Sequence, residues 1–294
     1  MKTLLVSFLI FVHALSALAK EPEVWVYFGT YTRQKESEGI YVSKLNLDTG
    51  NLSKPVLAAE GDNPSFLTIL PDSRRLIAVE ETNDYKDKSS GSLASYIIDE
   101  SKGSLRLINR ISTKGGAPCH ISADPSGRHV FFANYVGGSI GSASVSNDGV
   151  LGLSSFSQHT GSSVLPRQKS PHAHSIDLDP SGKFIVCADL GLDRLMIYKY
   201  DSSNGKLSAN DFASAKVEPG NGPRHFAFSN DGKYGYTNNE VTSSVTAFSF
   251  DASSTAGQFM EEEIAFKYPT LEKKYTNFSL TVEQGKIRKG EILG

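Results

Sequence analysis

An arginine and a glutamate stand at opposite ends of one predicted β-hairpin, where together they could act on an anion. Arg224 and Glu240 are equidistant from Gly232, which lies in an Asn-Asp-Gly-Lys turn, so antiparallel pairing sets them side by side. The planar guanidinium fork binds a carboxylate or phosphate and can stabilise an oxyanion that forms during a reaction. A glutamate beside it can fix the geometry of the arginine or serve as a base. The alternative is a cross-strand ion pair with only a structural role.

A histidine adds proton transfer to this chemistry, because its ordinary pKa near 6.5 lets it take or release a proton at neutral pH. His174 occupies the position equivalent to Arg224 in the preceding copy of an internal repeat. His172 could flank the same site, and Glu81 is the equivalent of Glu240 in an earlier copy. We therefore take His174, Arg224 and Glu240 as catalytic candidates, with His172 and Glu81 as candidates for substrate binding.

The other histidines are weaker candidates. His120 and His225 lie one residue further along their strands, so the pleat predicts that they point to the opposite face. His225 directly follows Arg224 and remains a candidate for substrate binding. His129 and His159 are predicted at the surface or in loops. The pair in His172-Ala-His174 lacks a nearby third ligand, so the sequence predicts no metal site.

A repeat of about 50 residues must position these side chains. Four segments share a pattern of inner strand, turn and second strand, and their turns begin at residues 71, 125, 180 and 230. Each copy contains four short β-rich runs, which is typical of a β-propeller blade built from four antiparallel strands. A β-sandwich is the alternative, but sandwiches do not repeat in this way. The residues equivalent to Arg224 and Glu240 differ between copies, so the fold alone does not demand them.

The ends of the chain do not make whole copies of the repeat. Residues 24–31, 39–47 and 51–60 predict the second, third and fourth strands of a blade that lacks its inner strand. The periodicity stops after Phe250, so we predict an incomplete propeller over residues 20–259 and a charged tail over residues 260–294. Residues 275–283 are the best candidate in the tail for the missing inner strand.

Composition and missing motifs exclude several classes of function. Apolar residues make up 39% of the 294-residue chain, enough for a packed core, and the net charge of −2 disfavours nucleic acid as a partner. Two cysteines exclude a disulfide-rich scaffold, and we expect Cys119 and Cys187 to be buried free thiols. No phosphate-binding glycine loop and no Gly-x-Ser-x-Gly motif occurs, so we expect neither a cofactor nor a serine nucleophile.

The first 19 residues are typical of a secretory signal peptide. Lys2 precedes an apolar run over residues 3–18, and the segment ends in Ala17-Leu18-Ala19, a pattern that signal peptidase accepts. We expect an extracellular protein that starts at Lys20, although a membrane anchor is the alternative. In a eukaryotic secreted protein, Asn51 and Asn277 would be glycosylation acceptors.

Several motifs in a fixed order resemble the seven-bladed β-propeller lactonase family, which includes propeller-type 6-phosphogluconolactonases and carboxymuconate cyclases. The resemblance covers residues 24 to about 250. The motifs that carry it are Phe28-Gly-Thr-Tyr-Thr32, Asp124-Pro-Ser-Gly127 with Asp179-Pro-Ser-Gly182, Pro171-His-Ala-His174, Gly222-Pro-Arg-His225 and Asn238-Asn-Glu-Val-Thr-Ser-Ser-Val245.

The resemblance implies hydrolysis of a sugar-acid lactone, with 6-phosphogluconolactone as the first candidate, by a monomer that binds a small anionic lactone. It assigns catalysis to His174, Arg224 and Glu240, together with an arginine from a later blade that this chain does not match. Because only four to five of seven blades are present, we expect a weak or inactive lactonase. Two alternatives stay open: a secreted propeller that binds without catalysis, and a muconate-type lactonising cyclase.

Overall fold

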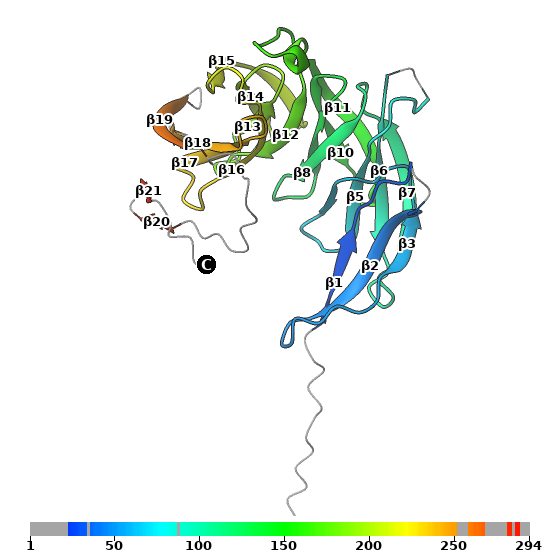
Figure 1. Ribbon diagram of the computed structural model, residues 1–294. Coiled ribbons are helices and arrows are strands. Elements are labelled where there is room, and N and C mark those ends of the chain that lie inside the picture. The colour runs from blue at the N-terminus through cyan, green and yellow to red at the C-terminus, as the bar shows by residue number, and fades with distance from the viewer. Residues whose placement is uncertain are drawn as a thin grey trace, which may run out of the picture.

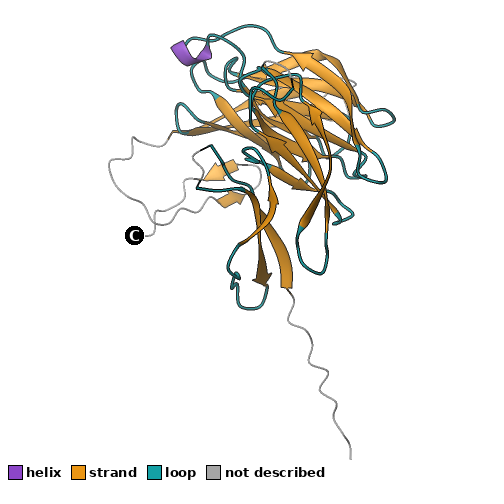
Figure 2. Ribbon diagram, turned by 90° about the vertical axis from the view of Figure 1, so that its right-hand side faces the viewer, coloured by secondary structure: helices purple, strands orange, loops and turns teal. Residues whose placement is uncertain are grey.

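The structure is a computed structural model that describes residues 23–33, 36–86, 89–251, 258–267, 281–283 and 286–288. Nearly all of its regular structure is β-strand, and the single short helix lies in a loop (Figure 2). The predicted signal segment and the candidate acceptor Asn277 lie outside the described residues. None of the described segments forms a helix long and apolar enough to span a lipid bilayer.

The described residues form 21 strands and one 3-10 helix. In chain order they are β1 (Glu23–Phe28), β2 (Gly39–Asn46), β3 (Val56–Glu60), β4 (Leu67–Ile69), β5 (Arg75–Glu80), β6 (Ser92–Ile98), β7 (Leu105–Ser112), β8 (Pro118–Ala123), β9 (His129–Asn134), β10 (Ser139–Val145), β11 (Leu151–Gln158), η1 (Pro166–Gln168), β12 (Ala173–Leu178), β13 (Phe184–Asp189), β14 (Arg194–Asp201), β15 (Lys206–Lys216), β16 (Pro223–Phe228), β17 (Tyr234–Asn239), β18 (Ser244–Asp251), β19 (Gln258–Lys267), β20 (Thr281–Glu283) and β21 (Lys286–Arg288).

Strands β1–β19 pair in chain order into five antiparallel sheets, and β20 pairs with β21 in a separate two-stranded sheet. The first sheet contains β1–β3, and β4–β7, β8–β11, β12–β15 and β16–β19 form four sheets of four strands each. The sheets follow one another along an arc, with β1–β3 in blue at one end and β16–β19 in yellow to orange at the other (Figure 1). The prediction of an all-β propeller with four-stranded antiparallel blades is confirmed.

The first sheet has three strands, as its sequence predicts. Within the described part of the chain, β1 pairs only with β2. Residues 275–280 of the tail lie outside the described residues, and β20 pairs with β21 rather than with β1. The described strands of the tail therefore do not supply the missing inner strand, for which residues 275–283 were the best candidate in the sequence.

The last sheet extends further than its sequence predicts. Strand β19 pairs with β18 from Asp251↔Gln258 to Ser244↔Lys267 and provides the fourth strand of its blade. The predicted boundary at residue 259 is therefore eight residues too early. The run Glu261-Glu262-Glu263 breaks the alternation of apolar and polar residues, and it hid this strand in the sequence.

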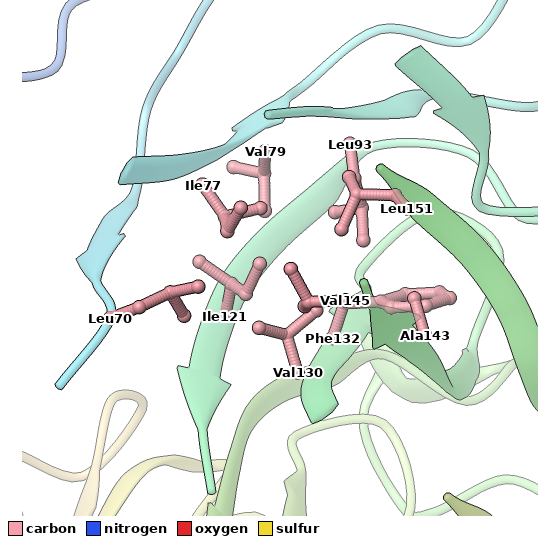
Figure 3. Close-up of a cluster of buried hydrophobic side chains, with 10 residues drawn as sticks. All are labelled: Leu70, Ile77, Val79, Leu93, Ile121, Val130, Phe132, Ala143, Val145 and Leu151. Atoms are coloured by element: carbon pink, nitrogen blue, oxygen red, sulfur yellow. The ribbon is translucent and has the colours of Figure 1, made fainter. Parts of the chain in front are cut away.

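The core lies between neighbouring sheets. One cluster joins Leu70, Ile77, Val79 and Leu93 of the second sheet to Ile121, Val130, Phe132, Ala143, Val145 and Leu151 of the third (Figure 3). The intervening residues of β9, Phe131 and Ala133, pack instead with the fourth sheet. Each sheet thus buries one face against each neighbour, because successive side chains of a strand point to opposite sides. This packing places the ends of the inner strands close together.

Two histidines that we predicted at the surface or in loops are buried between sheets. His129 and His159 have exposed fractions of 5% and 3%. His129 Nδ1 lies 2.8 Å from the hydroxyl of Tyr200, and His159 Nδ1 lies 2.6 Å from Oδ2 of Asp189. His159 does lie in a loop, directly after β11, whereas His129 begins β9, and neither is at the surface. Their burial was not predicted because both partners belong to the next sheet along the arc, and a pairing between sheets leaves no local pattern in the sequence.

Candidate active site

The inner strands of three sheets share an irregularity near their first residue. The strand register shifts at Cys119 in β8, at His174 in β12 and at Arg224 in β16. Such a bulge leaves one residue unpaired and turns its side chain away from the ordinary pleat. These three side chains and Ser65, which precedes β4, line one cavity of about 440 Å³.

Five of the six candidate residues from the sequence line this cavity, namely Glu81, His174, Arg224, His225 and Glu240. Glu81 and Glu240 each follow the last residue of the second strand of a blade, β5 and β17. The hairpin geometry expected from the sequence thus brings residues from the second, fourth and fifth sheets to one place. Tyr135, which follows β9, contributes from the third sheet.

The register of the last hairpin differs by one residue from our expectation. His225 pairs with Asn238 and Pro223 with Asn239, so Arg224 is the bulged residue and has no direct partner in β17. The bulge brings Arg224 and His225 to the same cavity, although they are adjacent in the sequence. Our prediction that His225 and His120 point away from His174 was therefore wrong. The ring of His225 lies 5.1 Å from that of His174 and 5.8 Å from that of His120.

Glu240 lies between two guanidinium groups. Its Oε2 is 2.9 Å from Nε of Arg224, and its Oε1 accepts a hydrogen bond of 2.7 Å from Nη2 of Arg167. Arg167 also contacts the hydroxyl of Tyr135 at 3.4 Å. The Glu240 carboxylate therefore holds the two half-exposed arginines, Arg167 and Arg224, next to each other. Each guanidinium group has further N–H groups that can donate to an anion.

Arg167 is the charged cavity residue that sequence reasoning missed. It belongs to η1, inside a connection of 14 residues between β11 and β12, whereas the other connections among the five sheets of β1–β19 have five or six residues. The repeat comparison passed over it because it has no equivalent in the other copies. The unusual length of the connection was the available signal, since binding residues often lie on loops that a rigid scaffold presents.

A second carboxylate closes the opposite side of the cavity. Oε2 of Glu81 accepts hydrogen bonds from the hydroxyls of Tyr31 at 2.8 Å and Ser65 at 2.6 Å. Partial burial, followed by the nearby Glu81 carboxylate, raises the pKa of Tyr31 above its ordinary value. Glu81 is thus held by two hydroxyl groups, and we expect it to accept hydrogen bonds from ligand hydroxyls rather than to bind an anion.

His172 flanks the cavity through Tyr135. Its ring stacks on the Tyr135 ring with centroids 4.7 Å apart, and its Nδ1 lies 3.0 Å from the Tyr135 carbonyl oxygen. Its backbone N–H donates to Oδ1 of Asp189 at 2.8 Å. These contacts place His172 behind the wall of the cavity, so it supports the orientation of Tyr135 rather than lining the space itself.

Three neighbouring histidines, His120, His174 and His225, are held in the neutral form. Burial, and then the charge of Arg224, lower the pKa of His174 to about 4, and its Nδ1 is buried without a hydrogen-bond partner. Burial lowers the pKa of His120 to about 3 and also lowers the pKa of His225. A neutral imidazole at pH 7 can accept a proton, which is the state that a general base requires.

Both cysteines are free thiols, as the sequence predicts. Cys119 lines the cavity, and burial raises the pKa of its thiol, so it is a poor nucleophile at neutral pH. In the part of the chain that the structure describes, no three His, Cys, Asp or Glu side chains gather as metal ligands. The side chains with ionisable groups that line the described cavity are those of arginine, histidine, glutamate, tyrosine and cysteine.

The fold and this cavity define a β-propeller protein with a polar, arginine-containing site where its inner strands begin. The chain belongs to the family described as Lactonase, 7-bladed beta-propeller, whose model matches residues 25–288.

Known proteins of this family are similar over most of the chain. A 6-phosphogluconolactonase of Bacillus subtilis is 35% identical over 244 residues, which is 83% of this chain and 66% of that protein. A 6-phosphogluconolactonase of Formosa agariphila is 32% identical, over 76% of this chain and 63% of that protein. The structure of the periplasmic gluconolactonase of Pseudomonas aeruginosa aligns with a TM-score of 0.77 at 31% identity, covering 90% of this chain and 74% of that one. The chain thus spans about two thirds of the length of the curated relatives that it matches.

Proposed function

We propose that the chain hydrolyses a sugar-acid lactone, with 6-phosphogluconolactone as the first substrate to test. The observation that carries the proposal is the pairing of Glu240 with both Arg167 and Arg224 on one cavity with a neutral His174. Two guanidinium groups suit an anionic substrate and an anionic product. Relatives named 6-phosphogluconolactonase and gluconolactonase support the choice of lactone.

In the proposed reaction, water attacks the carbonyl carbon of the lactone. His174 takes a proton from the attacking water, and Arg224 stabilises the negative charge that forms on the carbonyl oxygen. The bond between this carbon and the ring oxygen then breaks, and the protonated His174 returns its proton to the ring oxygen, which leaves as a hydroxyl group. The product is an open-chain hydroxy acid, which releases a proton to the solvent at neutral pH. Glu240 keeps the two guanidinium groups in place throughout.

A panel of substrates tests this proposal. We expect the purified chain to hydrolyse 6-phosphogluconolactone slowly, in line with the weak activity expected from the sequence, but measurably faster than the spontaneous reaction and with saturable kinetics in a pH-stat that records the released proton. Unphosphorylated gluconolactone tests the class of lactone, and a muconolactone tests the lactonising cyclase in its reverse direction. Saturable binding of 6-phosphogluconate with no turnover of any lactone would contradict catalysis and favour a binding propeller.

We also propose that residues 1–19 direct the protein out of the cytoplasm, based on Lys2, the apolar run and the Ala17-Leu18-Ala19 end. The name of the periplasmic relative is consistent with export. N-terminal sequencing of the protein recovered from the medium or from an exported compartment should begin at Lys20. A protein that keeps Met1 and fractionates with the cytosol would refute the proposal.

A further inference from the structure

Asp193 is a buried carboxylate outside the cavity that holds two loops at once. It lies in the turn between β13 and β14, and its exposed fraction is 4%. Its Oδ1 accepts hydrogen bonds from Nε2 of Gln168 at 2.8 Å and from the backbone N–H of Gly222 at 2.7 Å. Its Oδ2 accepts from the hydroxyl of Ser163 at 2.6 Å and from the backbone N–H of Gly220 at 2.7 Å.

The four donors belong to the two connections that carry the arginines of the cavity. Ser163 and Gln168 lie in the long connection on either side of Arg167, and Gln168 is fully buried next to it. Gly220 and Gly222 lie in the connection that leads into β16, where Gly222 is two residues before Arg224. A single carboxylate is therefore bonded to the side chains that flank Arg167 and to the backbone just before Arg224.

The backbone at this turn does not explain the aspartate. Asp193 has a φ of 52°, and the equivalent turns of the neighbouring sheets have Gly138 at 57° and Ser243 at 51°. This left-handed conformation is easiest for glycine and somewhat unfavourable for a residue with a side chain. Since another sheet makes the same turn with glycine, the carboxylate of Asp193 is there for its four hydrogen bonds.

From this geometry we infer that Asp193 is a positioning residue that sets the separation of Arg167 and Arg224 across Glu240, and so the affinity of the cavity for an anion. The inference rests on the proposed function, because it assigns the two arginines to the anion. A displacement of about 1 Å in a group that contacts the reacting substrate can lower a rate about 100-fold. Asp193 acts through the loops and does not touch the cavity.

The test compares Asp193→Asn with Asp179→Asn. Asparagine keeps one acceptor oxygen and replaces the other by an amino group, which cannot accept. If the amino group takes the place of Oδ1, the bonds from Gln168 and Gly222 are both lost; if it takes the place of Oδ2, the bond from Gly220 is lost, while the Ser163 hydroxyl can accept from the amino group instead. Asp179 is a matched control, because it is 2% exposed and accepts backbone hydrogen bonds from Lys183 and Phe184 at the opposite end of β13. We expect both variants to lose stability, but only Asp193→Asn to bind 6-phosphogluconate and inorganic phosphate at least tenfold more weakly in calorimetric titrations.

Ser163→Ala is a milder variant that loosens only the connection carrying Arg167, and we expect it to weaken phosphate binding by a smaller, measurable factor. Equal anion affinities in Asp193→Asn and Asp179→Asn would overturn the inference. If Asp193→Asn does not fold, equal affinities in Ser163→Ala and the wild type would overturn it.

Measurements of binding and of turnover distinguish this inference from the proposed function. Anion binding that depends on Asp193 without lactone turnover would retain this inference and reject the proposed function. Lactone turnover that does not change in Asp193→Asn would retain the proposed function and reject this inference. A wild-type chain that neither binds the anion nor hydrolyses a lactone would reject both.

Discussion

Replacing Arg224 by lysine should lower kcat/KM for 6-phosphogluconolactone by about 100-fold, the cost typical of removing one donor to a developing oxyanion. Lysine keeps the charge, but a point charge on a flexible stem cannot reproduce a planar fork held 2.9 Å from Glu240. The bulge at Arg224 aims this side chain into the cavity, and lysine at the same position leaves the backbone unchanged. Initial rates over a range of substrate concentrations measure the effect.

Arg74→Lys is the matched control for this experiment. Arg74 is a largely exposed arginine whose Nε pairs with Glu100 at 3.1 Å in the turn before β5. We expect its replacement to leave kcat/KM unchanged, since exposed ion pairs contribute little. Arg224→Lys with wild-type kinetics would show that the Arg224–Glu240 pair is a structural cross-strand ion pair.

His174→Gln should lower kcat by about 100-fold or more, because a positioned general base contributes on this scale. The wild-type pH profile should identify the same residue. Since burial and Arg224 lower the pKa of His174 to about 4, we expect kcat/KM to stay level from pH 7.5 down to about 5.5 and to fall only toward pH 4. Unphosphorylated gluconolactone is the substrate for this profile, because a phosphate monoester itself titrates at about pH 6. With that substrate, a profile that falls with an apparent pKa near 6.5 would contradict this assignment, because it would indicate an exposed histidine as the base.

The same shift predicts a dependence of stability on pH. Between about pH 6.5 and 4 the unfolded chain binds a proton at His174 that the folded protein does not, so this contribution to the free energy of unfolding decreases as the pH falls. Asp177 acts in the opposite direction, because burial raises its pKa to about 7 and the folded protein holds the proton over much of this range. The measurement is therefore the difference between wild type and His174→Gln in urea unfolding at pH 7 and pH 5. We expect the free energy of unfolding of the wild type, relative to that of His174→Gln, to be lower at pH 5 than at pH 7. A difference between the two proteins that is the same at both pH values would refute the prediction.

The repeat predicted most of the fold because each blade carries its own turn and apolar pattern. Gly127, Gly182 and Gly232 all take the positive φ that these turns need, so the copies could be aligned residue by residue. That alignment also predicted that His174, Arg224 and Glu240 lie near one another, and all three line the cavity. The bulges at Cys119, His174 and Arg224 were not predictable, because a bulge is a property of the pairing of two strands rather than of one. One unpaired residue per strand was enough to turn His225 toward the cavity instead of away from it.

The contacts that depend on loops and on neighbouring sheets also escaped prediction. Arg167 reaches Glu240 across 73 residues of sequence, and the loop that carries it is held by the distant Asp193 in addition to local hydrogen bonds such as that from Ser163 N–H to the Gln168 carbonyl. His159 pairs with Asp189 between sheets in the same way. Periodicity reports which face of a strand is buried, whereas it carries no information on which side chains of two sheets will meet.

The central claim is that the cavity at the mouth of the blades hydrolyses a sugar-acid lactone. Its most direct test is the initial rate of 6-phosphogluconolactone hydrolysis at pH 7 for the purified chain and for the double variant His174→Gln/Arg224→Ala, with the spontaneous rate subtracted. We expect saturable catalysis by the wild type and no rate above the spontaneous reaction for the double variant. A wild-type rate equal to the spontaneous one, or a double variant that keeps the wild-type rate, would contradict the claim.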